Sequence, residues 1–488
     1  MKNKWLWVGM VLILTLSALL HFLRLENRPP HHDESINGWF IERLLNDPKD
    51  YTYSPEHYHG PTFFYLGAFS AKHLGLRLFS LRLVTALFGF ALCFAPLLLI
   101  NELGIVGVLI AMFLFSTAPA FVFYSRYAIH ETLLVALFTY FAIFLYRYIF
   151  YGERILFYFA ALLFGIACAT KETVVIYAAG VGLGLVGALL FQKKPPEKLW
   201  AWLKKRFVTR NFYIDAAYFG VLFAFGLFLF FKKAEVVAFF KSYFFYAKLG
   251  TKHTGHEKPW PYFFAYFPRD EWFLMLGALG GGMYAAIRRT RLSLFCLFWA
   301  GVVFTAHSLI PYKTPWIIIN LMVPLVFLTG EWVNALWVAA KGNSEKSLVV
   351  LCVGILAFFT VQKSYSYSFV EFYEPINRYA YVQTVESART IANKIKSILD
   401  LNPEEQVDFL SDPEWPYPFL LAGYKKVYYW RKIVDPISAK IVVARDSQYA
   451  DVLPKLKKNY TEEKFNVRPG LDMILFIAED ELKMPSKP

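Results

Sequence analysis

The sequence carries little charge for its length, and this excludes an ordinary soluble fold. Of its 488 residues only 18% are Asp, Glu, Lys or Arg, whereas charged residues make up roughly one quarter of a typical soluble protein. Hydrophobic residues account for 57% of the chain. Several apolar runs of about 18 or more residues are long enough to cross a bilayer core roughly 30 Å thick. The composition therefore indicates a polytopic α-helical membrane protein.

Cysteines are also scarce, and their placement excludes a disulfide framework. Each of the four stands alone in a hydrophobic segment: Cys93, Cys168, Cys296 and Cys352. They show neither the paired spacing of a disulfide-rich domain nor the spacing of a zinc site. The chain also lacks internal repeats, low-complexity tracts and a small-residue cleavage motif after its first apolar run, so we expect that run to be an uncleaved span.

Hydropathy predicts about eleven transmembrane helices. Their expected limits are 5–23, 79–100, 105–124, 130–149, 155–170, 173–191, 212–231, 271–287, 293–309, 315–337 and 347–362. Together they form a membrane domain over residues 1–362. The net charge of +14 lies largely in short connecting loops, which favours contact with anionic membrane lipids over a nucleic-acid partner.

The basic loops predict the orientation of the chain. Lys and Arg gather at 147–154, 192–211, 288–291 and 341–346. If these loops are inside, the N-terminus is inside and the loops 24–78 and 232–270 are outside. We expect a multi-pass protein of the cytoplasmic (inner) membrane, with an interfacial amphipathic helix near 62–73.

Polar residues return after residue 362, and they predict an extracytoplasmic α/β domain over 363–488. Helical patterns occur near 382–399 and 446–460. Strand patterns occur near 406–410, 425–430, 439–444 and 471–478.

Two adjacent carboxylates follow the first span. Asp33 and Glu34 come directly after His31 and His32 and a proline pair that ends the helix. One interpretation is a solvated loop that caps a helix. The other is a catalytic site, because neighbouring carboxylates repel and this raises at least one pKa toward that of a useful base. The residues alone leave open which of the two is the base.

Cations lie at the same ends of the spans as these carboxylates. Arg126, Lys171 and Lys313 provide donors that suit a lipid phosphate, while a carboxylate beside them suits deprotonation of a hydroxyl. Lys313 is also consistent with a snorkelling side chain. The outer loops contain further polar and aromatic residues typical of a substrate pocket: His59, His256, Glu257, Trp260 and Tyr312.

A divalent metal ion is a further candidate, but its ligand pattern is weak. The candidate ligands are His31, His32, His130 and Glu131. None of the histidines shows the i, i+4 spacing of a helical zinc motif. No cofactor is therefore certain.

The sequence resembles the GT-C superfamily of polyprenyl-phosphate-dependent glycosyltransferases. The resemblance rests on the Asp33-Glu34 pair after the first span and on the segments 124–131 and 170–173, and covers residues 1–330. Relatives include the protein O-mannosyltransferases and the lipid A aminoarabinose transferase. The segments 58–61, 254–260 and 310–316 resemble a mostly archaeal, flippase-activity-associated subfamily implicated in N-glycan assembly.

This resemblance implies an inverting transfer of a sugar from a polyprenyl-phosphate donor to a hydroxyl on a glycan, lipid or protein acceptor. Asp33 would correspond to the base, and Lys171, Lys313 and Arg126 would neutralise the leaving phosphate. His130-Glu131 stands where metal-using relatives often place an Asp, so metal dependence stays open. The alternative is a lipid-linked sugar flippase, or its accessory, which has no evident use for the carboxylate pair.

Overall fold

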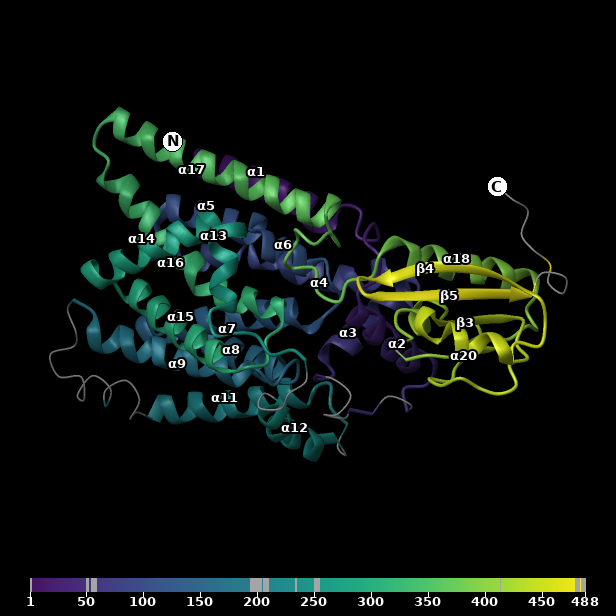
Figure 1. Ribbon diagram of the computed structural model, residues 1–488. Helices are drawn as coiled ribbons and strands as arrows, with labels where there is room; N and C mark the ends of the chain where they lie inside the picture. Colours follow the sequence, from purple (N-terminus) through teal and green to yellow (C-terminus); the bar gives the residue numbers. More distant parts are fainter. Residues whose placement is uncertain are drawn as a thin grey trace.

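The computed structural model describes residues 2–49, 52–53, 59–193, 204, 210–232, 235–249, 255–412, 414–478 and 483. It consists of a bundle of long helices and, at one end, a smaller domain built on a sheet (Figure 1). Most of the predicted basic loop 192–211 lies outside the described residues, as do residues 250–254 of the predicted outer loop and Tyr58 of the 58–61 motif.

A helix lies at each of the eleven predicted spans. They are α1 (Lys2–Phe22), α4 (Leu78–Leu92), α5 (Ile100–Thr117), α7 (His130–Tyr151), α8 (Arg154–Cys168), α9 (Val174–Phe191), α11 (Arg210–Phe228), α14 (Trp272–Arg288), α15 (Arg291–Leu309), α16 (Ile318–Ala339) and α17 (Asn343–Tyr365). Within the described residues, seven helical stretches are long and apolar enough to cross a membrane. The protein is a multi-pass membrane protein, as predicted.

Helix α16 lies at the centre of the bundle. The most apolar stretch of α16 is 94% buried inside the protein, whereas that of α17 is only 6% buried. Helix α17 therefore lies on the outside of the bundle. Small residues let the central helices approach closely. A Cβ added to Gly107 of α5 would lie 2.7 Å from the carbonyl oxygen of Gly330 in α16. The bundle core is thus set by backbone contacts that larger residues would prevent.

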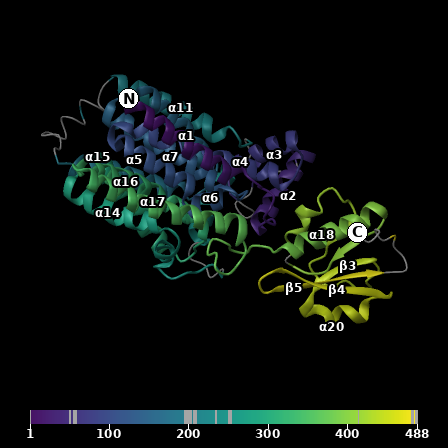
Figure 2. The same cartoon turned by 90° about the horizontal axis from the view of Figure 1, so that it is seen from above.

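Three helices lie in the two long loops: α2 (His32–Asn46), α3 (Thr62–Leu74) and α12 (Val236–Leu249). Helix α3 matches the amphipathic helix predicted near 62–73. Helix α2 was not predicted, although His31 and Glu34 form a capping box at its start. In both views α2 and α3 lie at the end of the bundle nearest the sheet domain (Figure 1 and Figure 2).

The C-terminal domain contains a five-stranded sheet in the order β2-β1-β3-β5-β4. The strands are β1 (Val407–Phe409), β2 (Val427–Tyr429), β3 (Ile441–Arg445), β4 (Tyr460–Arg468) and β5 (Leu471–Ala478). Strand β1 is parallel to β2 and β3, while β5 is antiparallel to β3 and β4. Helix α18 (Glu386–Leu401) packs on one face and the short α20 (Tyr449–Val452) on the other.

Four of these strands match the prediction, and one part of it is wrong. The helix predicted near 446–460 is reduced to α20 between short 3₁₀ turns, and the edge strand β4 follows it. Pro454 interrupts the helical pattern. Strand β4 is polar along most of its length because it lies at the sheet edge, so it lacks the apolar signal of a core strand.

Candidate functional site

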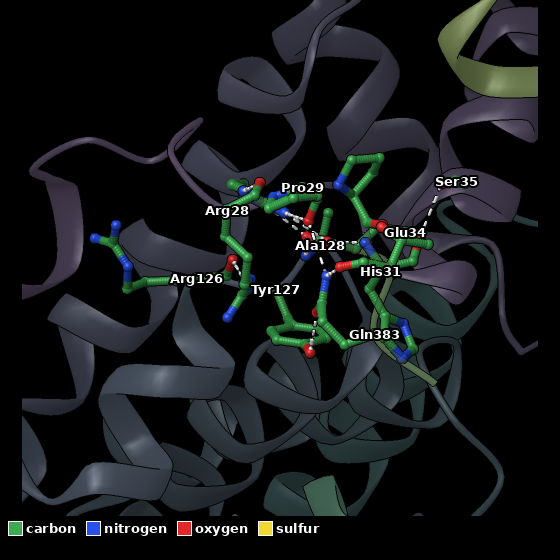
Figure 3. Close-up of polar contacts among 12 residues, drawn as sticks. Arg28, Pro29, His31, Glu34, Ser35, Arg126, Tyr127, Ala128 and Gln383 are labelled. Carbon is green, nitrogen blue, oxygen red and sulfur yellow. Dashed lines mark hydrogen bonds and ion pairs between the residues drawn. The ribbon is translucent and has the colours of Figure 1, made fainter. Parts of the chain in front are cut away.

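The carboxylate of Glu34 is buried and completely hydrogen-bonded at the start of α2. Arg82 of α4 donates to both of its oxygens at 2.7 Å, from Nε and Nη2. The backbone N–H groups of His31 and Ala128 also donate to it, each at 2.8 Å. Figure 3 shows Glu34 beside His31 and Ala128. Burial alone would raise the pKa of Glu34, but the charge and hydrogen bonds of Arg82 outweigh it and hold the pKa at about 2.

The neighbouring arginines hold the surrounding backbone. Arg126 donates to the carbonyls of Leu20 and Arg24, at 3.0 and 2.9 Å, and so caps the end of α1. Arg28 donates to the carbonyl of Arg126 at 2.6 Å, and its guanidinium lies 3.8 Å from the ring centre of Tyr127. The guanidinium of Arg126, predicted to bind a donor phosphate, is thus directed at the end of a helix.

Asp33 has a different environment from its neighbour. It is partly exposed, and no described residue donates a hydrogen bond or forms an ion pair with its carboxylate. Burial raises its pKa, while the nearby charges of His32, Lys171 and His256 oppose the rise. Environment therefore moves the pKa values of two consecutive carboxylates in opposite directions, a pattern that distinguishes acid–base groups from structural ones.

Lys171 lies at the corner between α8 and α9, near Asp33. Its ammonium forms an ion pair with Glu131, whose other oxygen accepts a 2.5 Å hydrogen bond from Asn320. The sequence predicted Lys171 as a phosphate ligand and Glu131 as a metal ligand. Glu131 is occupied on both oxygens, while the charge of Lys171 reaches Asp33.

His59 lies against the same corner. Its Nδ1 is 2.9 Å from Glu172, which also accepts a 3.1 Å hydrogen bond from Tyr53. Gly60 fits here because an added Cβ would lie 2.1 Å from the carbonyl oxygen of Ala169. Burial raises the pKa of Glu172 to about 7 and lowers that of His59 well below its usual value. The first outer loop is thereby fixed to the corner that carries Lys171.

Two other predicted segments pair with each other beside Asp33. Glu257 and Tyr312 form an isolated antiparallel bridge, and the ammonium of Lys313 donates to the carbonyls of Lys258 and Ile310. The ring of Tyr312 lies 5.1 Å from that of His256. Burial and the charge of Asp33 raise the pKa of Tyr312 to about 12. Of the predicted pocket, this pairing brings His256 and Tyr312 close enough to interact with Asp33.

Trp260 is separate from this cluster: it is 67% exposed, and its ring packs against Phe264. Its place in a substrate pocket stays a prediction.

The linker before α18 completes the site, and the sequence did not predict it. His256 Nδ1 lies 2.6 Å from the Tyr381 hydroxyl. Gln383 accepts a 2.6 Å hydrogen bond from the Tyr127 hydroxyl and donates to the carbonyl of Pro29 at 3.0 Å (Figure 3). These residues are some 350 positions from the N-terminal loop, so no local pattern indicates them. Arg82 did carry a signal, as a charged residue inside a predicted span.

The predicted metal ligands have hydrogen-bond partners within the protein. His31 Nδ1 accepts a hydrogen bond from the backbone N–H of Asp33, so Nε2 carries the proton and donates to the Tyr381 carbonyl. His32 Nδ1 accepts from Arg468 at 3.1 Å. In the part of the chain that the structure describes, no three His, Cys, Asp or Glu residues form a group able to hold a metal.

Comparison with known proteins confirms the fold. No family model matches the sequence, and neither does a curated protein sequence. Among solved structures, ArnT from Cupriavidus metallidurans bound to undecaprenyl phosphate matches with a TM-score of 0.68 and 14% identity over 97% of this chain and 98% of that one. The oligosaccharyltransferase AglB from Archaeoglobus fulgidus, in complex with an inhibitory peptide and a dolichol-phosphate, matches with a TM-score of 0.56 and 13% identity over 100% and 75%. The chain thus has the GT-C fold.

Removing Arg82 tests the buried ion pair. In Arg82→Leu, Glu34 stays buried without its partner, so we expect the free energy of unfolding to fall by roughly 3–5 kcal/mol. Thermal denaturation of the purified protein in detergent measures this. Arg77 at the N-cap of the same helix is exposed, so Arg77→Leu is the matched control. An Arg82→Leu protein as stable as the control would contradict the structural role.

Glu172 predicts a pH dependence of stability. Its pKa of about 7 lies above the ordinary 4.5, so between these values the folded protein holds a proton that the unfolded chain has lost. Its contribution to stability therefore falls as pH rises through that window. Glu172→Gln keeps the neutral form, and its stability relative to wild type should improve from pH 5 to pH 8 by roughly 1–3 kcal/mol.

Denaturation at both pH values measures this difference. The exposed Glu374 provides the control: Glu374→Gln should differ from wild type equally at both. A difference for Glu172→Gln that does not change with pH would rule out the raised pKa.

Proposed function

We propose that the protein is an inverting glycosyltransferase that moves a sugar from a polyprenyl-phosphate donor to a hydroxyl acceptor. The observation that carries this proposal is the contrast within one dipeptide. Glu34 is fully engaged by the fold, whereas Asp33 presents a carboxylate without a described partner to a cluster of cationic and aromatic side chains. The GT-C fold supports the same activity.

Asp33 is the proposed general base. In a single displacement its carboxylate takes the proton of the acceptor hydroxyl as that oxygen attacks the anomeric carbon. The bond from this carbon to the phosphate oxygen breaks, and the polyprenyl phosphate leaves with the bonding electrons. Burial keeps the pKa of Asp33 above its usual value, which makes the carboxylate a stronger base. Attack from the face opposite the phosphate inverts the anomeric configuration.

Lys171 is the proposed ligand of the leaving phosphate. Its ammonium has three N–H groups, of which Glu131 takes one. The charge of Lys171 also reaches Asp33, so a phosphate bound to it would lie near the base. Cations fixed in advance stabilise the negative charge that grows on the leaving group.

Arg126 and Lys313 are proposed as positioning residues, since backbone carbonyls take their hydrogen bonds. His59, His256, Glu257 and Tyr312 are proposed to shape the substrate pocket. No step is assigned to a metal, because Glu131 and His31 are occupied by other partners.

The proposed orientation follows the basic loops: the N-terminus inside, and the sheet domain with Asp33 outside the cytoplasmic membrane. A lipid-linked sugar flippase is the alternative, and the following experiment separates the two.

Asp33→Asn tests the base. Purified protein is incubated with a radiolabelled polyprenyl-phosphate sugar, and release of sugar to water is measured. We expect wild type to release sugar slowly and Asp33→Asn to lose activity by about 10²–10⁴-fold, with donor affinity within twofold. Asp47→Asn, an exposed position at the other end of α2, should behave as wild type. Sugar release retained by Asp33→Asn would refute the assignment, and donor binding without release by wild type would favour the flippase.

Lys171→Gln tests the phosphate ligand. We expect donor affinity to fall at least about tenfold, because a charge-assisted hydrogen bond is lost. Asn320→Ala is the matched control, because it frees Glu131 on its other oxygen but keeps the ammonium. Lys171→Arg should recover much of the affinity. If Asn320→Ala weakens donor binding as much as Lys171→Gln, the effect comes from Glu131 and the phosphate assignment fails.

A further inference from the structure

The register of the sheet brings two arginines to one end of the C-terminal domain. Arg445 ends β3 and pairs with Met473 near the start of β5. Arg468 ends β4 and pairs with Leu471, across a tight turn that Gly470 enables with φ 79°. Because β3 and β4 both run antiparallel to β5, their C-terminal ends lie at the same end of the sheet. In Figure 1 the end of β4 points toward the helical bundle.

The linker before α18 holds this end of the sheet against the start of α2. The backbone N–H of Val385 donates to the carbonyl of Val467, next to Arg468, at 3.0 Å. Two residues earlier, Gln383 forms an isolated bridge with His31. The β4–β5 turn is therefore attached to the same segment that holds the loop carrying Asp33.

The two guanidinium groups lack carboxylate partners among the described residues. Arg468 Nη1 donates to His32 Nδ1 at 3.1 Å, and within the described residues this is the one hydrogen bond that its side chain forms. Arg445 Nε is buried and has no hydrogen-bond partner in the described part of the chain. Burial and the charge of Arg445 lower the pKa of Arg468, while Asp33 raises it. The charges of Arg445 and of the proposed base Asp33 thus both reach the guanidinium of Arg468.

Aromatic side chains border the same place. The ring of Trp415, from the C-terminal domain, lies 6.4 Å from that of His32 and 6.1 Å from that of Trp39 in α2. Both tryptophans are partly exposed. An apolar ring surface next to guanidinium groups without carboxylate partners is suited to a ligand that is both cyclic and anionic.

We propose that Arg445 and Arg468 form an acceptor subsite that binds a carboxylate or phosphate group of an anionic sugar while its hydroxyl reaches Asp33. This inference rests on the proposed function and names its acceptor class. Lys171 approaches Asp33 from the end of the membrane helices and Arg468 from the C-terminal domain, so donor phosphate and acceptor anion have separate cations. The planar fork of arginine matches both oxyanions.

Binding of defined sugars to the full-length protein tests the subsite. Glucuronic acid, glucose 6-phosphate and glucose are titrated by calorimetry into wild type, Arg445→Gln/Arg468→Gln and Lys426→Gln. We expect at least one anionic sugar to bind wild type tenfold or more tightly than glucose. The double variant should lose that advantage. Lys426 directly precedes β2 at the opposite end of the parallel strands, so its variant should bind as wild type does.

Tighter binding of glucuronic acid would identify the group on the acceptor as a carboxylate, and tighter binding of glucose 6-phosphate would identify it as a phosphate. Equal binding of glucose and both anionic sugars to wild type would overturn the proposal, and so would unchanged binding in the double variant. Thermal denaturation in detergent reports the folding of the double variant, and its midpoint should match that of Lys426→Gln.

The donor experiment also distinguishes the two possible sources of the anion. A tenfold loss of donor affinity in the double variant would assign the arginines to the donor phosphate and overturn the acceptor subsite. The proposed function itself fails on a separate result, donor binding without release by wild type, which does not depend on these arginines.

Discussion

The ion pair of Glu34 and Arg82 is the interaction on which the site depends. A carboxylate removed from water is tolerated only where every lone pair has a partner, and here Arg82, His31 and Ala128 provide them. Because these donors come from α4, the start of α2 and the segment before α7, one side chain joins three parts of the bundle. Successive residues on a helix point about 100° apart. Anchoring Glu34 inward therefore turns Asp33 toward the linker and the C-terminal domain.

Much of the architecture could be predicted because local composition determines where the helices and most strands lie. Apolar runs predicted the positions of eleven helices, and β5 was predicted with its limits. The failures have physical causes. Strand β4 lies at a sheet edge and is polar, and Pro454 limits α20. Helix α2 has only a weakly apolar face, so hydropathy does not indicate it.

The site could be predicted only in its parts. Asp33, Lys171, His256 and Tyr312 were all selected from the sequence, and their charges or rings interact in the structure. The sequence does not show which partner a buried polar group chooses, because burial requires a partner but does not specify it. Arg126, for example, was predicted to bind a phosphate, but its guanidinium donates to backbone carbonyls of the same protein. Tyr381, Gln383 and Arg468 join the site only through long-range contacts, so local patterns do not reveal them.

A transfer between a lipid and a polar acceptor needs a base that both can reach. Helix α1 ends at Phe22. After a short connection that includes the proline pair Pro29-Pro30, helix α2 begins at His32, so Asp33 stays close to the ends of the spans. The chain returns to the same loop some 350 residues later, where the side chain of Gln383 donates to the carbonyl of Pro29. The β4–β5 turn is attached to this segment because the N–H of Val385 donates to the carbonyl of Val467. Through these contacts the carboxylate of Asp33 lies between the ends of the membrane helices and the C-terminal domain. Asp33 and Arg468, far apart in the sequence, therefore lie at one place, as the proposed transfer requires.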